Sequence, residues 1–179
     1  MALTKRTLLL RLTKYLLGIT VLSLLLVLID YSFDLRPRNV QQNYHFSLKT
    51  NDIAYDSPVW LRQDNLQILL IKRSVKLRNQ LSQSKQDLQD PDSHSSRQPG
   101  YAKNSLRSKD DLYFVSYAIG TDLSCPLELK QKQILKEICS VASYDFAGRA
   151  FSGSNQFRNL TIPDYNFNDD FSRLTISIY

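Results

Sequence analysis

Residues 144–153 read Y-D-F-A-G-R-A-F-S-G, residues 159–167 read N-L-T-I-P-D-Y-N-F, and residues 174–178 read L-T-I-S-I. The last two runs are rich in β-branched and aromatic residues, which favour strands. The residues between them, Asn168-Asp169-Asp170, are of the type that forms turns. We therefore predict a terminal β-hairpin from residues 159–167 and 174–179.

Further short β-like runs precede this segment, at residues 44–49, 59–62, 66–71 and 113–119. Between the third and the fourth run, residues 74–88 show the spacing of a polar helix, with apolar residues at Val75, Leu77, Leu81 and Leu88. Residues 89–109 are polar and contain proline and serine, so we expect a solvent-exposed loop there. The sequence predicts a mainly β, antiparallel domain with a helix-loop insertion and no internal repeat.

The N-terminal part of the chain has a different composition. Residues 15–29 form an uncharged, leucine-rich run, and basic residues precede it at Lys5, Arg6, Arg11 and Lys14. A cleaved signal peptide would need small residues after the run, whereas Asp30-Tyr31-Ser32-Phe33-Asp34 follows it. We therefore expect a retained anchor at residues 15–33, between a cytoplasmic basic tail at 1–14 and a linker at 34–43 that contains Pro37.

Charge and cysteine content exclude several classes of function. The formal net charge is +6, and the basic residues before the apolar run supply much of it, so nucleic-acid binding has little support. Cys125 and Cys139 are the only cysteines, and His45 and His94 lie far from them in the sequence. No zinc, P-loop or serine-hydrolase motif is present.

Several short motifs occur together in a fixed order along the chain. They are K-R-S at 72–74, Q-L-S at 80–82, D-P-D-S at 90–93, Q-P-G-Y at 98–101 and I-G-T-D-L-S-C at 119–125, followed by the three C-terminal runs quoted above. In this order the chain resembles the proteobacterial Rieske iron–sulfur subunit of the ubiquinol–cytochrome c reductase complex, whose C-terminal half reads Y-D-x-x-G-R and then N-L-x-x-P-x-Y. The resemblance covers most of the chain and implies a Rieske-like β domain at residues 44–179.

The resemblance also marks the positions that hold the [2Fe–2S] cluster in that family. A Rieske cluster takes two thiolates on one iron and two imidazoles on the other, from the boxes C-T-H-L-G-C and C-P-C-H-G-S. In this chain Gly120 and Glu137 stand at the thiolate positions, and Asp122 and Ser140 stand at the imidazole positions. Glycine has no ligand atom, and oxygen donors replace thiolates poorly. We therefore expect no [2Fe–2S] cluster and no catalytic residue.

The remaining cysteine of each family box forms a disulfide between the two loops. Cys125 and Cys139 occupy these two positions, so the resemblance implies a Cys125–Cys139 disulfide; two free, buried cysteines are the alternative.

Two further departures from the family pattern agree with the loss of the cluster. The loop after Gly153 has no proline in residues 154–157, and Ala142 replaces a serine that hydrogen-bonds the cluster in the family. Tyr144 remains at the family's tyrosine position, where we expect a core aromatic residue.

Two functions follow from these expectations. The first is a cluster-free Rieske-fold protein that serves as a structural, assembly or regulatory component of a respiratory ubiquinol–cytochrome c reductase complex. Its candidate partners are the membrane, the cytochrome b and cytochrome c subunits, or a ligand-complete Rieske protein. The alternative is an electron-transfer subunit that binds another metal or uses Asp122, Glu137 and Ser140 as unconventional ligands. The expected location is a bacterial inner membrane, with the β domain in the periplasm.

Overall fold

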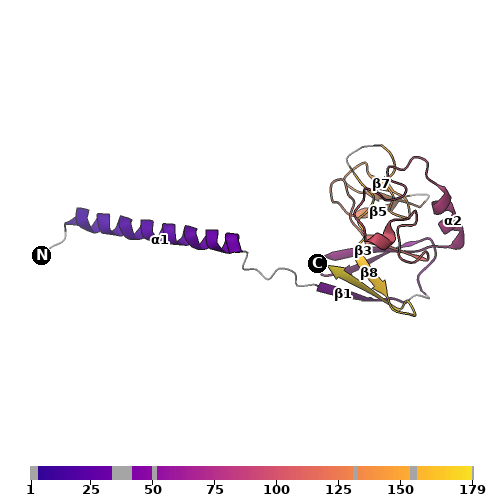
Figure 1. Cartoon of the computed structure of the whole chain (residues 1–179), viewed down its shortest axis with the longest axis horizontal. Coiled ribbons are helices and arrows are strands. Elements are labelled where there is room, and N and C mark those ends of the chain that lie inside the picture. Colours follow the sequence, from indigo (N-terminus) through magenta and orange to yellow (C-terminus); the bar gives the residue numbers. More distant parts are fainter. Residues whose placement is uncertain (1–3, 34–41, 50–51, 131–132, 154–156, 179) are drawn as a thin grey trace. The chain divides into compact units, whose positions relative to one another are not determined.

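The computed structural model describes residues 4–33, 42–49, 52–130, 133–153 and 157–178. The chain divides into two compact units, Met1–Val40 and Gln41–Tyr179. Figure 1 shows the helix of the first unit and the strands of the second. The expected linker at residues 34–43 lies almost wholly outside the described residues.

The first unit contains one long helix, α1 (Lys5–Phe33). Its span Lys5–Ser32 is long and apolar enough to cross a membrane. The hydroxyls of Thr13 and Thr20 donate to the carbonyls of Leu9 and Leu16, at 3.1 and 2.8 Å. These polar side chains are therefore satisfied within the helix, as an apolar surrounding requires. The helix also includes most of the basic segment that the sequence assigned to a tail.

The described residues of the second unit form three antiparallel sheets of three strands each, together with short helices, so the predicted mainly β fold is confirmed. The first sheet has the order β1 (Gln42–Ser47), β9 (Arg173–Ile178), β8 (Asp164–Phe167), and the second has the order β2 (Pro58–Gln63), β3 (Leu66–Lys72), β4 (Tyr113–Tyr117). The third has the order β5 (Leu127–Lys130), β6 (Ile134–Glu137), β7 (Ser143–Tyr144).

One cluster of buried apolar side chains draws on all three sheets and forms the core. In the central strand β3, Ile68, Leu69, Leu70 and Ile71 are all fully buried, so both faces of this strand are covered. The ring of Tyr113 on β4 lies 5.0 Å from the ring of Phe167 on β8, which joins the two sheets through aromatic packing. The predicted terminal hairpin is present as β8 and β9, although its first strand begins at Asp164.

Helix α2 (Val75–Gln83) is shorter than the predicted helix at 74–88. Ser74 caps its start by accepting a hydrogen bond from the Leu77 amide, and Ser84 ends it in an extended conformation. Asp87 has a positive φ of 60°, a backbone conformation that a right-handed helix excludes. Leu88 instead forms an isolated β-bridge with Phe151. The predicted helix was too long because the apolar spacing continues past the residue at which the backbone leaves the helical conformation.

The loop at residues 89–109 is not the exposed segment that its composition predicted. It contains the short helix η1 (Gly100–Ala102), and its residues Ser93, Ala102 and Arg107 are buried. The guanidinium of Arg107 donates to the carbonyls of Gly148 (2.8 Å) and Leu160 (2.7 Å). A loop rich in polar residues is thus packed into the domain because its side chains reach distant backbone groups.

Candidate functional site

Two loops bring the four family ligand positions and both cysteines together. Gly120, Asp122 and Cys125 lie in the loop between β4 and β5, whereas Glu137 ends β6 and Ser140 follows it. The loops are held by backbone hydrogen bonds, among them Ile138 N to Pro126 O (3.1 Å) and Gly120 N to Cys125 O (2.9 Å). The site is therefore built by the third sheet and the segment that leads into it.

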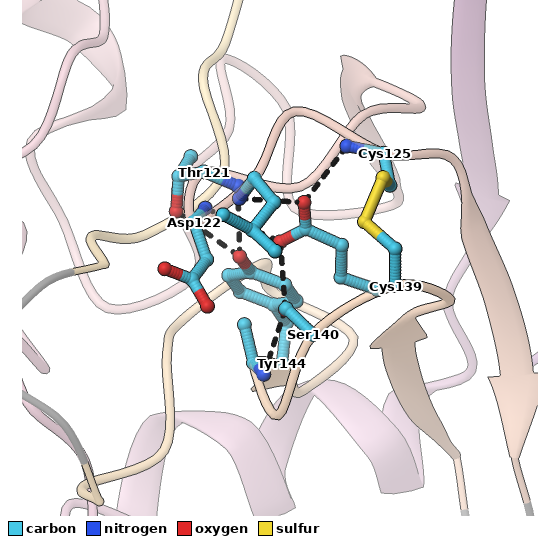
Figure 2. Close-up of a disulfide and its surroundings, with 9 residues drawn as sticks. Thr121, Asp122, Cys125, Cys139, Ser140 and Tyr144 are labelled. Atoms are coloured by element: carbon cyan, nitrogen blue, oxygen red, sulfur yellow. Dashed lines mark hydrogen bonds between the residues drawn. A yellow bond between two sulfur atoms is a disulfide. The ribbon is translucent and has the colours of Figure 1, made fainter.

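Cys125 and Cys139 form a disulfide with a Cα–Cα distance of 6.1 Å, as the resemblance implied. Figure 2 shows it at one edge of the site. The bond closes a segment with a sequence separation of 14, for which loop entropy predicts about 3 kcal/mol of stabilisation. A carboxylate oxygen of Glu137 lies within 4.8 Å of both sulfurs. Sulfurs joined to each other are not thiolates, so this group is no metal site in the oxidised chain.

The carboxylate of Glu137 occupies the centre of the site. Its side chain is buried, with 0% exposure. Oε1 accepts hydrogen bonds from the amides of Leu123 (2.9 Å) and Cys125 (2.8 Å). Oε2 accepts from the amide of Asp122 (3.2 Å) and from the hydroxyl of Ser140 (3.2 Å). Successive amides that point at one anion form a binding nest, and here the anion belongs to the chain itself.

Gly120 makes room for this carboxylate. A Cβ atom at residue 120 would lie 2.2 Å from Oε2 of Glu137, far inside van der Waals contact. Any other residue at 120 would therefore expel the Glu137 carboxylate from its amide nest. The two residues at the family's thiolate positions thus form one packing unit, in which the glycine leaves a space and the glutamate fills it.

The other two candidate residues play different parts. Ser140 donates to Glu137, and its Oγ accepts from the amide of Ala142 at 3.1 Å. Asp122 contributes its backbone amide, whereas its carboxylate points away from the disulfide (Figure 2). The side chains of Glu137 and Ser140 thus contact each other, whereas the Asp122 carboxylate does not join them.

Tyr144 is buried and packs against Phe157, with ring centroids 6.2 Å apart, in agreement with a core aromatic residue. Its hydroxyl also accepts from the amide of Thr121 at 2.9 Å and lies 3.0 Å from the Thr121 hydroxyl. Burial raises the pKa of this phenol, so it remains protonated. Sequence reasoning missed Thr121; only the retained tyrosine hinted at a polar contact. The loop residues 154–156 lie outside the described residues.

Comparisons with known proteins find similarity to solved structures. No family model and no curated protein matches the chain. A solved structure titled "Hyperthermophilic respiratory Complex III" is similar to it with a TM-score of 0.44 and 13% sequence identity. The match covers 90% of this chain and 96% of that chain. A likeness of this level assigns neither a family nor a function.

Proposed function

We propose that this protein is a membrane-anchored domain of Rieske type without a [2Fe–2S] cluster, and that it serves a respiratory ubiquinol–cytochrome c reductase complex in a structural, assembly or regulatory role. The link to that complex rests on the ordered sequence motifs. The loss of the cluster rests on the packing of Gly120 against Glu137. The protein then contributes a folded surface to the complex and transfers no electron itself.

The Gly120–Glu137 pair is the observation that carries this proposal. A Rieske iron needs two thiolates, and these positions provide no side chain and a carboxylate that already accepts four hydrogen bonds. The amides of residues 122, 123 and 125 are directed at Glu137, so the loop is arranged around an internal anion. These residues do not fit the cluster.

Exposed apolar side chains in both loops support a role in docking. Leu123, Ile138 and Val141 are 62%, 56% and 77% exposed. They flank the disulfide, which holds the two loops in a fixed relation. Exposed apolar side chains beside a disulfide favour a surface that a partner covers.

The proposed location is a bacterial inner membrane, with the N-terminus in the cytoplasm and the β domain in the periplasm. Basic residues before the apolar helix favour this orientation by the positive-inside rule. The disulfide supports it independently, because such bonds persist in the periplasm and are rare in the cytosol.

Measurement of iron and acid-labile sulfide on the full chain tests the proposal. The chain is purified in detergent from cells that also express the iron–sulfur assembly machinery, and we expect neither iron nor sulfide. Iron and sulfide in equal amounts, with the visible absorption of a Rieske cluster, would contradict a cluster-free domain.

A variant with the family ligands restored provides the matched control. It carries Gly120→Cys, Asp122→His, Glu137→Cys and Ser140→His, and removal of Glu137 also removes the clash at residue 120. We expect this variant to take up iron and sulfide if the two loops descend from a Rieske site. A folded variant that binds no iron would argue against the Rieske assignment, whatever the natural chain contains.

A further inference from the structure

A cavity of about 440 Å³ opens beside the loop that carries Gly120 and Thr121. The lining residues that matter here are Arg97, Tyr117, Thr121, Ser124, Arg158 and Thr161. None of the described lining residues is acidic. Its volume lies in the range of small-molecule sites.

Two arginines give this cavity its charge. Arg97 and Arg158 are exposed, and within the described part of the chain neither guanidinium has a hydrogen bond or ion pair. The buried arginines behave differently: Arg149 is paired with Asp145 at 2.7 Å, and Arg107 donates to backbone carbonyls. Two uncompensated cations on one concave surface attract an anion of matching charge.

The backbone that carries both arginines is fixed in place. The amide of Arg158 donates to Thr121 Oγ1 at 3.1 Å, and that hydroxyl donates in turn to the Arg158 carbonyl. The neighbouring Asn159 is buried, and its amide group donates to the Asp90 carbonyl at 2.7 Å. The carbonyl of Arg97 accepts from the Ile162 amide at 3.2 Å. The cavity wall is thus ordered before any ligand binds, which reduces the entropic cost of binding.

Hydroxyl groups complete the set of donors. Among the described contacts, the side-chain hydroxyls of Tyr117, Ser124 and Thr161 have no hydrogen-bond partner. Burial raises the pKa of the Tyr117 phenol, so it keeps its proton and remains a donor at neutral pH. The described lining of the cavity therefore offers guanidinium and hydroxyl donors and no carboxylate to repel an anion.

We propose that this cavity binds a phosphate monoester, with Arg97 and Arg158 as its charged partners and the hydroxyls of Tyr117, Ser124 and Thr161 as further donors. A monoester carries a charge of about −1.5 to −2 at neutral pH and three acceptor oxygens. This charge matches two arginines better than the single charge of a carboxylate ligand would. Arginine also binds phosphate in a bidentate manner. The inference goes beyond the proposed function and holds whether or not a cluster is present.

Titration calorimetry on the full chain in neutral detergent tests the proposal, with glycerol 3-phosphate as the probe and glycerol as the uncharged control. A second arm uses the chain in phosphatidylcholine nanodiscs with and without phosphatidic acid, and measures protection of the cavity from hydrogen exchange. Binding of glycerol 3-phosphate would identify a soluble ester, whereas an effect of phosphatidic acid alone would identify a lipid headgroup. Absence of both would overturn the proposal.

Substitutions at the two arginines locate the binding. We expect Arg97→Gln and Arg158→Gln each to weaken binding at least about tenfold, because each removes a charge-assisted contact, and the double variant to abolish it. Arg62→Gln, at an exposed arginine outside the cavity, should leave binding unchanged. Unchanged binding in the double variant would place the anion elsewhere and contradict the proposal, and neither result bears on the iron measurement.

Discussion

The Glu137 carboxylate is a buried anion whose partners are three amides and one hydroxyl. Glu137→Gln keeps the shape of the side chain but turns one acceptor oxygen into an NH₂ donor that faces other donors. Because buried hydrogen bonds to a charged group contribute about 1.5–3 kcal/mol, we expect the free energy of unfolding to fall by about 2–3 kcal/mol. Guanidinium denaturation of the full chain, followed by the fluorescence of its single tryptophan, Trp60, measures this change.

Glu128→Gln is the matched control for this prediction. Glu128 is partly exposed and pairs with Lys130 at 2.9 Å on the surface of β5. Surface ion pairs contribute about 0–1 kcal/mol, so this variant should remain close to the natural chain. Equal stability of the Glu137 and Glu128 variants would show that the amide nest does not depend on an anion.

The sequence identified the positions of this site but not their relation. The resemblance placed Gly120 and Glu137 at two thiolate positions and suggested an oxygen-ligand set as an alternative. That Glu137 enters the space left by Gly120 depends on backbone positions 17 residues apart in the chain, which no local pattern encodes. The direction of the Asp122 carboxylate likewise depends on the path of the loop and not on its composition.

The hydrogen bonds of the Asp90 carboxyl, in the loop at residues 89–109, depend on pH. Partial burial raises the pKa of its carboxyl, but hydrogen bonds from the Ser96 hydroxyl and the amides of His94 and Ser95 outweigh this effect, and the net pKa lies below its ordinary value. A carboxyl with a lowered pKa in the folded state stabilises the fold above its ordinary pKa, and this contribution is lost as the pH falls through the lower, folded-state value.

We therefore expect Asp90→Asn to flatten the acid side of the stability profile. Below about pH 4, the free energy of unfolding of the natural chain should decline more steeply than that of the variant, because only the natural chain must protonate this carboxylate. Denaturation curves between pH 7 and pH 3 provide the measurement. Parallel profiles for the two proteins would show that the hydrogen bonds at Asp90 do not favour its ionised form.

Among the secondary-structure elements, the strands were predictable and the packed loop was not. Alternation of polar and apolar residues indicated β1, and runs of β-branched, aliphatic or aromatic residues indicated β2 to β4 and the terminal hairpin. The strands β5 to β7 are only four, four and two residues long, too short for such a pattern to be distinctive. The loop at residues 89–109 is polar in sequence, yet its buried Arg107 bonds to carbonyls about 40 to 53 residues away in the chain.

Arg107→Lys tests whether this arginine holds the loop in place. Lysine keeps the buried charge, but its single ammonium cannot reach the carbonyls of Ala147, Gly148 and Leu160 and the Gln98 side chain together. We expect a loss of about 2–4 kcal/mol in the free energy of unfolding. Limited proteolysis should cut the loop faster in this variant, whereas Arg62→Lys on the exposed face of β2 should match the natural chain. Unchanged stability of the Arg107 variant would show that packing alone orders the loop.

For the molecule as a whole, the proposed membrane orientation links the flanking charges of one unit to the disulfide of the other. The apolar helix α1 and the β domain are separate compact units, so the compartment that the domain enters depends on the charges that flank the helix. Basic residues stand before the apolar run at Lys5, Arg6, Arg11 and Lys14, and only Arg36 and Arg38 follow closely behind it. The bias agrees with the orientation proposed above, in which the N-terminus is cytoplasmic and the β domain meets an oxidising compartment where Cys125 and Cys139 can pair.

Reversal of the leading charges should therefore change the redox state of the cysteines more than 100 residues away. When Lys5, Arg6, Arg11 and Lys14 are all replaced by Glu, Arg36 and Arg38 become the dominant flanking charges, and we expect the β domain to stay in the cytosol with two free thiols. Cells are lysed under denaturing conditions in the presence of a polyethylene-glycol maleimide, which alkylates free thiols. The variant should then migrate more slowly on a gel, whereas the natural chain should do so only after its disulfide is reduced. Replacement of the exposed Lys76 and Lys103 by Glu reverses charge on the β domain instead, and this control should behave like the natural chain. A fully oxidised variant would show that these charges do not set the orientation, and free thiols in the natural chain would contradict a periplasmic domain.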